Sequence, residues 1–138
     1  MKAVIGHDGS TAAVGAIRMA ASLPWPDVSE LHIVRVAGSA QESAQDRADL
    51  DAAAALLVGE GRSVVTSLVT GRPAPILRDR AAELEADLLI LGARGMSPIR
   101  ELLLGSVSAE LIERAPCSVI VARGEGHDRL VVGTDASR

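Results

Sequence analysis

The fold is decided by residues 87–106, which have the sequence DLLILGARGMSPIRELLLGS. Leu88 to Leu91 form a short, continuous apolar run that ends at a glycine, and such a run predicts a strand buried on both faces of a parallel sheet. The chain must then turn, and Gly105-Ser106 opens a helix that we predict over 107–114. A helix that starts just beyond the carboxyl end of a strand offers unpaired backbone N–H groups and a partial positive charge. We therefore expect phosphate groups to bind at this point.

The glycines of this stretch have a distinctive spacing. Two residues separate Gly92 from Gly95, nine separate Gly95 from Gly105, and Ser106 follows at once. No Lys-Ser or Lys-Thr pair follows, as it would in a Walker loop, and the Rossmann spacing G-x-G-x-x-G is missing. The pattern resembles the G-x-x-G-x9-G-[ST] signature of the ATP-binding branch of the universal stress protein family. The alternative is that Gly92 and Gly95 only shape a turn, while Ser106 is an ordinary helix N-cap.

Strands and helices are expected to alternate along the chain. Short apolar runs predict the strands, and amphipathic segments between them predict the helices. This alternation indicates an α/β fold: a single three-layer, Rossmann-like domain with a five-stranded parallel sheet and helices on both faces. If the first and fourth strands are the neighbours at the point where the connections leave in opposite directions, the strand order is 3-2-1-4-5. That order places Asp8, after the first strand, beside Gly92, after the fourth. We expect strands at 2–6, 31–36, 64–69, 88–91 and 118–122, and helices at 10–23, 42–58, 75–86 and 107–114.

The second of these helices is rich in alanine. Its apolar residues recur at helical spacing, which predicts one buried face. The stripe expected to be buried consists of Ala44, Ala48, Ala52, Ala55 and Leu56.

Composition narrows the classes of function. The 138 residues carry a net charge of -4 and no long basic run, and Trp25 is the only aromatic residue. We therefore expect no nucleic-acid partner, because there is neither a basic surface nor a platform for stacking bases. No apolar run is long enough to cross a membrane, and Cys117 is the single cysteine. These features favour a cytoplasmic protein that interacts with no membrane.

The resemblance to the universal stress protein family extends over nearly the whole domain. Residues 4–10 (VIGHDGS) resemble the opening strand and turn of that family, and residues 71–74 (GRPA) resemble its Gly-x-Pro-Ala helix entry. Residues 86–92 (ADLLILG) and 115–119 (APCSV) resemble its fourth and fifth strand entries. The resemblance implies that Asp8 lies at the adenosine end and that the backbone around Val36 meets the adenine edge. The nucleotide-binding residues that it implies are Asp8, Val36, Gly92, Gly95, Gly105, Ser106 and Val107.

The resemblance implies an ATP-binding regulatory protein of the stress response, in which any ATP hydrolysis is slow. The sequence shows no second carboxylate at a spacing that would complete a metal site with Asp8, and it shows no clear general base. We therefore assign no metal ligand and no catalytic residue. Mg²⁺ or Mn²⁺ would then be held through the nucleotide phosphates. Two alternatives remain open. One is an enzyme similar to the adenine-nucleotide alpha hydrolases, and the other is an interaction module that binds no nucleotide.

The end of the chain repeats its beginning. Residues 129–137 (RLVVGTDAS) mirror residues 2–10 (KAVIGHDGS), and residues 124–128 have the composition of a linker. We interpret residues 1–123 as the nucleotide-binding domain, and 124–138 as a linker and the start of a second copy; the alternative is a chance apolar tail. An apolar strand without a covering helix is expected to pair with a sheet edge, in its own chain or in a partner's. The resemblance also implies a homodimer that pairs through the edge strand 118–122.

Overall fold

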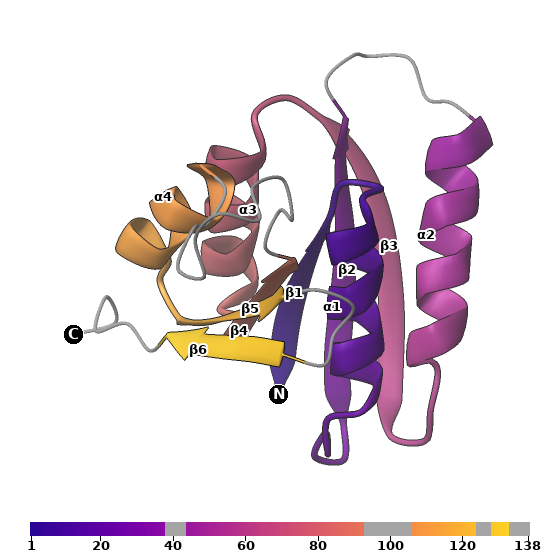
Figure 1. Ribbon diagram of the computed structural model, residues 1–138. Coiled ribbons are helices and arrows are strands. Elements are labelled where there is room, and N and C mark those ends of the chain that lie inside the picture. Colours follow the sequence, from indigo (N-terminus) through magenta and orange to yellow (C-terminus); the bar gives the residue numbers. More distant parts are fainter. Residues whose placement is uncertain (38–43, 93–105, 124–127, 133–138) are drawn as a thin grey trace.

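The computed structural model describes residues 1–37, 44–92, 106–123 and 128–132 (Figure 1). Strands and helices alternate along this part of the chain. The strands are β1 (Lys2–His7), β2 (Ser29–Ala37), β3 (Arg62–Thr70), β4 (Leu88–Gly92), β5 (Ser118–Arg123) and β6 (Asp128–Val132), and the helices are α1 (Thr11–Ala21), α2 (Ala44–Leu57), α3 (Pro73–Leu84) and α4 (Ser106–Arg114).

One sheet organises the molecule. Its strand order is β3-β2-β1-β4-β5-β6, and β1 to β5 are all parallel to their neighbours. Helices α1 and α2 cover one face, and α3 and α4 cover the other (Figure 1). The predicted α/β fold, with five parallel strands in the order 3-2-1-4-5, is confirmed. The start of the β1–β4 pair is fixed by two hydrogen bonds: the Lys2 N–H donates to Oδ2 of Asp87 (2.9 Å), and the Asp87 N–H donates to the Lys2 carbonyl (2.7 Å).

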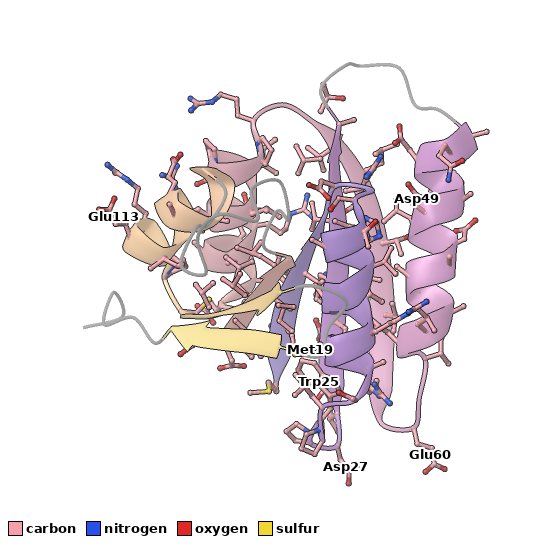
Figure 2. The ribbon with its side chains drawn as sticks, viewed as in Figure 1. Met19, Trp25, Asp27, Asp49, Glu60 and Glu113 are labelled. Carbon is pink, nitrogen blue, oxygen red and sulfur yellow. The ribbon has the colours of Figure 1, made fainter. Side chains whose placement is uncertain are left out.

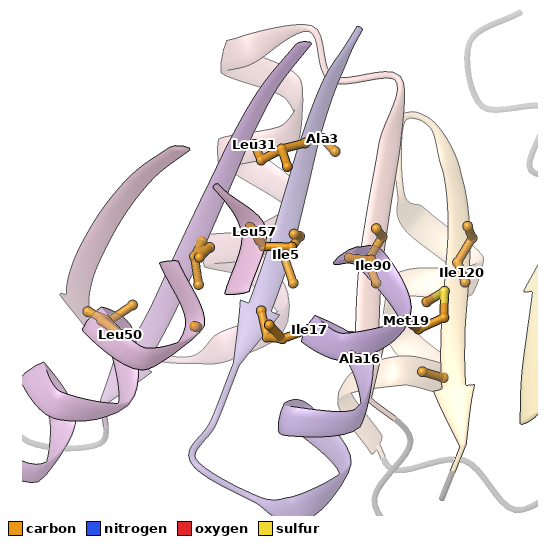
Figure 3. Close-up of a cluster of buried hydrophobic side chains, with 14 residues drawn as sticks. Ala3, Ile5, Ala16, Ile17, Met19, Leu31, Leu50, Leu57, Ile90 and Ile120 are labelled. Carbon is orange, nitrogen blue, oxygen red and sulfur yellow. The ribbon is translucent and has the colours of Figure 1, made fainter. Parts of the chain in front are cut away.

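Each face of the sheet has its own apolar core. Successive side chains of a strand point to opposite faces, so Ala3 and Ile5 of β1 face α1 and α2, whereas Val4 faces α3 and α4. Full burial of an aliphatic side chain stabilises the fold by about 1.5–3 kcal/mol. The α1/α2 core (Figure 3) contains Ile5, Ile17, Leu31, Ile33, Leu50, Leu57, Ile90 and Ile120, and the α3/α4 core contains Val4, Val34, Leu77, Leu89, Leu111, Val119 and Val121.

The prediction of the buried face of α2 is wrong. Every residue of the predicted alanine stripe that the structure describes is exposed, including Leu56 at 48%. The helix instead buries a face whose members are spaced by four, three and four residues, which fits a helical repeat. The first residue of this face is Asp46, so a search for apolar residues alone does not detect the pattern. The buried residues are Asp46, Leu50, Ala53 and Leu57.

Several element boundaries differ from the predicted ones, for reasons that differ from one element to the next. β2 begins at Ser29 rather than at residue 31, since the Ser29 N–H donates to the Gly61 carbonyl (2.8 Å) and extends the pairing with β3. α1 ends at Ala21 because the Ser22 N–H already closes the last turn on the carbonyls of Met19 and Ala20. α3 begins at Pro73, whose fixed φ suits a first helical turn.

The sequence predicted β5 to be an edge strand of the sheet. In the structure β6 pairs with β5 and is the edge strand instead. The two strands are antiparallel, with Ile120 paired to Val131. Strand 118–122 is therefore flanked by β4 and by β6, and two β5 strands can pair across a dimer only where β6 has detached. Among the described residues, no helix is long and apolar enough to cross a membrane.

Candidate functional site

The carboxyl ends of β1, β2 and β4 meet at one edge of the sheet. His7, at the end of β1, is in register with Arg35 of β2, so the positions that follow, Asp8 and Val36, lie at neighbouring strand ends. On the other side of β1, Ile5 is in register with Ile90, two residues before the end of β4. Parallel α/β sheets bind ligands at this edge, where the connections on either side of the first strand leave in opposite directions.

Gly92, the last residue of β4, lies directly against the first turn of α1. A β-carbon built on Gly92 would be 2.5 Å from the Ala12 carbonyl carbon and 2.8 Å from the Ala13 nitrogen, and would also collide with the Ala12 carbonyl oxygen. No side chain fits in that space, which explains the glycine physically. The sequence predicted that Asp8 and Gly92 lie at the same edge of the sheet. In the structure Gly92, at the end of β4, contacts α1, the helix that follows Asp8.

The turn between β1 and α1 is held by side chains from within it. The Ser10 N–H donates to Oδ1 of Asp8 (2.9 Å), and the Ala13 N–H donates to the Ser10 hydroxyl oxygen (3.1 Å), so Ser10 is the N-cap of α1. Gly9 adopts a φ of 83°, a left-handed conformation that favours glycine. Asp8 is exposed at the tip, and its carboxylate lies at the positive end of the helix dipole.

His7 supports this turn from below. Its ring is buried, and Nδ1 accepts a hydrogen bond from the Gly9 N–H (3.0 Å). Burial lowers the pKa of His7 from its ordinary value of 6.5, and the positive charge of Arg35 lowers it further, against weaker opposite effects of Asp49 and Asp8. A neutral imidazole is what the geometry requires, because a protonated Nδ1 cannot accept the Gly9 N–H. His7 is not among the residues that the sequence predicted for the site.

The sequence prediction missed a charged cluster that lies behind this turn. Arg35 of β2 donates from Nε (3.1 Å) and from Nη2 (2.6 Å) to Oδ1 of Asp46 on α2, and Oδ2 of Asp49 lies 3.7 Å from Nη2. The Arg35 and Asp46 side chains are each only 13% exposed. The sequence did contain a signal for this cluster. Arg35 interrupts an apolar strand, and the next helix carries two aspartates three positions apart.

Val36 lies one residue beyond Arg35 and faces the other side of the sheet. It is partly buried, pairs with Val69 of β3, and packs against the α3/α4 core. Its backbone lies at the edge where the resemblance places the adenine.

The remaining predicted site residues lie after β4. Gly95 and Gly105 are outside the described residues. Ser106 begins α4, and Val107 is its second residue. Because α4 connects two parallel strands, it runs antiparallel to them, so its N-terminus points to the same edge as Asp8. The N-termini of α1 and α4 therefore both direct backbone N–H groups and positive dipole ends toward this edge, which suits an anionic ligand.

The described residues offer no separate metal site. Within those ranges, no three side chains of His, Cys, Asp or Glu are grouped closely enough to hold a metal ion. In the part that the structure describes, the carboxyl edge thus combines backbone N–H donors with the exposed carboxylate of Asp8, a set suited to binding phosphates and hydroxyl groups.

Comparison with known proteins gives one consistent result. Residues 1–123 match the model of the universal stress protein family. A universal stress protein of Thermus aquaticus is 39% identical over 56 residues, which is 41% of this chain and 41% of that protein. The chain thus spans less than half the length of the curated relatives it matches first.

Two solved structures share the fold. The crystal structure of a universal stress protein in complex with cAMP is 29% identical and has a TM-score of 0.73, with 89% of this chain and 96% of that chain covered. A universal stress protein of Archaeoglobus fulgidus is 26% identical and has a TM-score of 0.68; the match covers 88% of this chain but only 43% of that one.

Proposed function

We propose that this chain, which belongs to the universal stress protein family, binds an adenine nucleotide at the carboxyl edge of its sheet. The observation that carries the proposal is the close backbone contact between Gly92 and the first turn of α1. It joins the end of β4 to the turn of Asp8, and so gives one ligand access to both. The complex of a relative with cAMP supports the same class of ligand.

Each predicted residue has a role in this proposal. Asp8 accepts hydrogen bonds from the ribose hydroxyl groups, and the backbone at Val36 meets the adenine edge. The glycines allow the backbone to approach the ligand, and the amides at the start of α4 bind the phosphates. The proposed binding residues are Asp8, Val36, Gly92, Gly95, Gly105, Ser106 and Val107.

ATP is the proposed ligand, and Mg²⁺ or Mn²⁺ enters with it, held through the phosphate oxygens. The proposed role is regulatory: the nucleotide-bound form is the signal in a stress response, and hydrolysis is slow. A fast phosphoryl transfer would need an oriented water and a charge-neutralising group. The described part of the edge supplies one exposed carboxylate, Asp8.

Isothermal titration calorimetry with ATP, AMP and cAMP, each with and without Mg²⁺, tests the proposal. We expect saturable binding of at least one of these nucleotides. Gly105→Val should abolish the binding, whereas Val65→Ala, on the exposed surface of β3, should leave it unchanged. A protein that binds none of the three, while circular dichroism shows it folded, would refute the proposal. Steady-state phosphate release then distinguishes a slow hydrolase from a regulator that does not turn over.

We also propose that β6 and a homodimer contact compete for the edge of β5. β6 pairs with that edge in the structure, and the repeat in its sequence suggests the first strand of a second domain copy. The Archaeoglobus fulgidus structure, of which this chain covers 43%, is in keeping with a second copy. The double variant Leu130→Pro/Val131→Pro removes two consecutive N–H donors, at least one of which must face β5. Light scattering should show more dimer than in the wild type; an unchanged mass would contradict the competition.

A further inference from the structure

We propose that Arg35 is a positioning residue of the nucleotide site: its guanidinium group, held by Asp46, supports Gly9 and thereby fixes the turn that presents Asp8. The inference rests on the proposed nucleotide-binding function. It adds a residue that touches no ligand and that no glycine motif predicts.

The first argument is the contact between Arg35 and Gly9. A β-carbon built on Gly9 would lie 2.8 Å from Nη2 and 3.0 Å from Cζ of Arg35, and would collide with Nη1. The edge of the guanidinium group that carries Nη1 and Nη2 therefore lies against Gly9, and a β-carbon at this position would displace it. Gly9 also has a φ of 83°, so both its backbone conformation and the nearby guanidinium group favour glycine at this position.

The second argument is how firmly the guanidinium group is held. Two hydrogen bonds to Asp46, at 3.1 and 2.6 Å, fix the plane of the group, and Asp49 lies on the same side of it. Charge-assisted bonds between largely buried groups are short and directional. Nη1, which lies against Gly9, is buried and has no hydrogen-bond partner among the described residues. An arginine kept at this cost is better explained by what it supports than by stability.

The third argument is the link to His7. The charged groups that act on its imidazole ring are Arg35 on β2, Asp49 on α2 and Asp8 in the turn itself, and Arg35 has the largest effect of the three. Arg35 therefore favours the neutral imidazole, which accepts the Gly9 N–H. Arg35 thus acts on Gly9 in two ways. It packs against Gly9 directly, and it favours the neutral form of His7, which accepts the Gly9 N–H.

The chain contains a matched control. Arg62, at the start of β3, packs against Gly59 in the same way: a β-carbon there would lie 2.5 Å from Nη2 and 2.7 Å from Nε. Its Nη1 is likewise buried without a partner among the described residues. Arg62 lies at the opposite end of the sheet, because it pairs with Ser29 at the start of β2. Figure 2 shows this separation: Asp27 and Glu60, which flank the Arg62 end, are at the bottom, and Asp49 is near the top.

The experiment compares Arg35→Met with Arg62→Met in the full chain. Three quantities are measured: the free energy of unfolding, the pKa of His7 by NMR, and the Kd for ATP with Mg²⁺. We expect both variants to lose stability. Only Arg35→Met should raise the pKa of His7 and weaken ATP binding, by about tenfold, the order seen when a group that orients a binding residue is lost. Arg35→Lys, which keeps the charge without the planar fork, should leave the pKa of His7 low but restore affinity only in part.

The outcomes separate the two proposals. An unchanged Kd in a folded Arg35→Met protein, or an equal loss in Arg62→Met, would overturn the positioning role while the nucleotide site stands. Wild-type protein that binds no nucleotide would overturn the proposed function and this inference together. If Arg35→Met does not fold, Asp46→Asn replaces it: it keeps the shape of the side chain and loosens the hold on Arg35. The same tenfold loss is expected, and an unchanged Kd would again refute the inference.

Discussion

Gly92 and Ala12 are in direct backbone contact, although they are eighty positions apart in the sequence: a β-carbon on Gly92 would lie 2.5 Å from the Ala12 carbonyl carbon. This contact joins the end of β4 to the beginning of α1. Because the obstacle is backbone rather than the tip of a side chain, it cannot move aside without shifting the helix.

Gly92→Ala should therefore destabilise the protein by about 1–3 kcal/mol, the usual range for overpacking, and weaken nucleotide binding. Gly6→Ala is the control. Its β-carbon would meet the end of the Leu77 side chain, at 2.8 Å from Cδ1, and a side chain can adjust. Chemical denaturation and calorimetry measure both variants. Equal losses of stability would contradict the assignment of a rigid contact to Gly92.

Asp8 can be tested for two roles separately. Asp8→Asn keeps an oxygen that accepts the Ser10 N–H, so stability should stay near that of the wild type. Asp8→Ala removes this bond and should cost about 0.5–1.5 kcal/mol. Both should weaken ATP binding by roughly tenfold or more, because a charge-assisted hydrogen bond to the ligand is lost. An Asn variant with wild-type affinity would limit Asp8 to shaping the turn.

The N-cap of α1 should be measurable in isolation. Ser10→Ala leaves the Ala13 N–H without its side-chain acceptor and should lower the free energy of unfolding by about 0.5–2 kcal/mol. Ser10→Asp should restore most of this loss. Trp25, the only aromatic residue, provides the fluorescence signal, since its Nε1 donates to the Ala20 carbonyl (2.8 Å) at the end of α1. Identical denaturation midpoints for all three proteins would refute the cap.

Protonation of His7 should make stability depend on pH. Its pKa is lowered in the folded state, first by burial and then by Arg35, so the unfolded chain binds the proton more readily. The stabilising effect is complete above the ordinary pKa of 6.5, decreases as the pH falls below it, and levels off below the folded pKa. His7→Asn retains an acceptor for the Gly9 N–H without titrating. The variant should lose this part of the pH dependence in denaturation experiments; an unchanged slope would contradict the prediction.

Cys117 should be slow to react in the folded protein. Burial raises the pKa of its thiol, and the negative charge of Asp87 adds to the effect, so little thiolate is present near neutral pH. Ellman's reagent should react slowly with the native protein and rapidly after addition of urea. Rapid reaction of the native protein would show that the entry to β5 opens readily.

The strands and helices were predictable because their signals are local. Apolar runs such as Leu88 to Leu91 and the punctuation by glycine and proline depend on residues close in sequence. Boundaries were less accurate, since a bond such as Ser29 N–H to the Gly61 carbonyl joins segments that the sequence keeps apart. The buried face of α2 was assigned wrongly because Asp46 takes a core position that a search for apolar residues passes over.

By itself the sequence determined the layered α/β fold, because periodicity and glycine spacing express local backbone and solvation preferences. The strand order and the placement of Asp8 near Gly92 followed only when the first and fourth strands were taken as neighbours. Only the tertiary structure decided that Gly92 rests on Ala12, that His7 is buried under the turn, and that Arg35 packs against Gly9 while bound to Asp46. Burial, and the charge interactions that burial strengthens, depend on which distant segments pack together. That information is present in no single stretch of the chain.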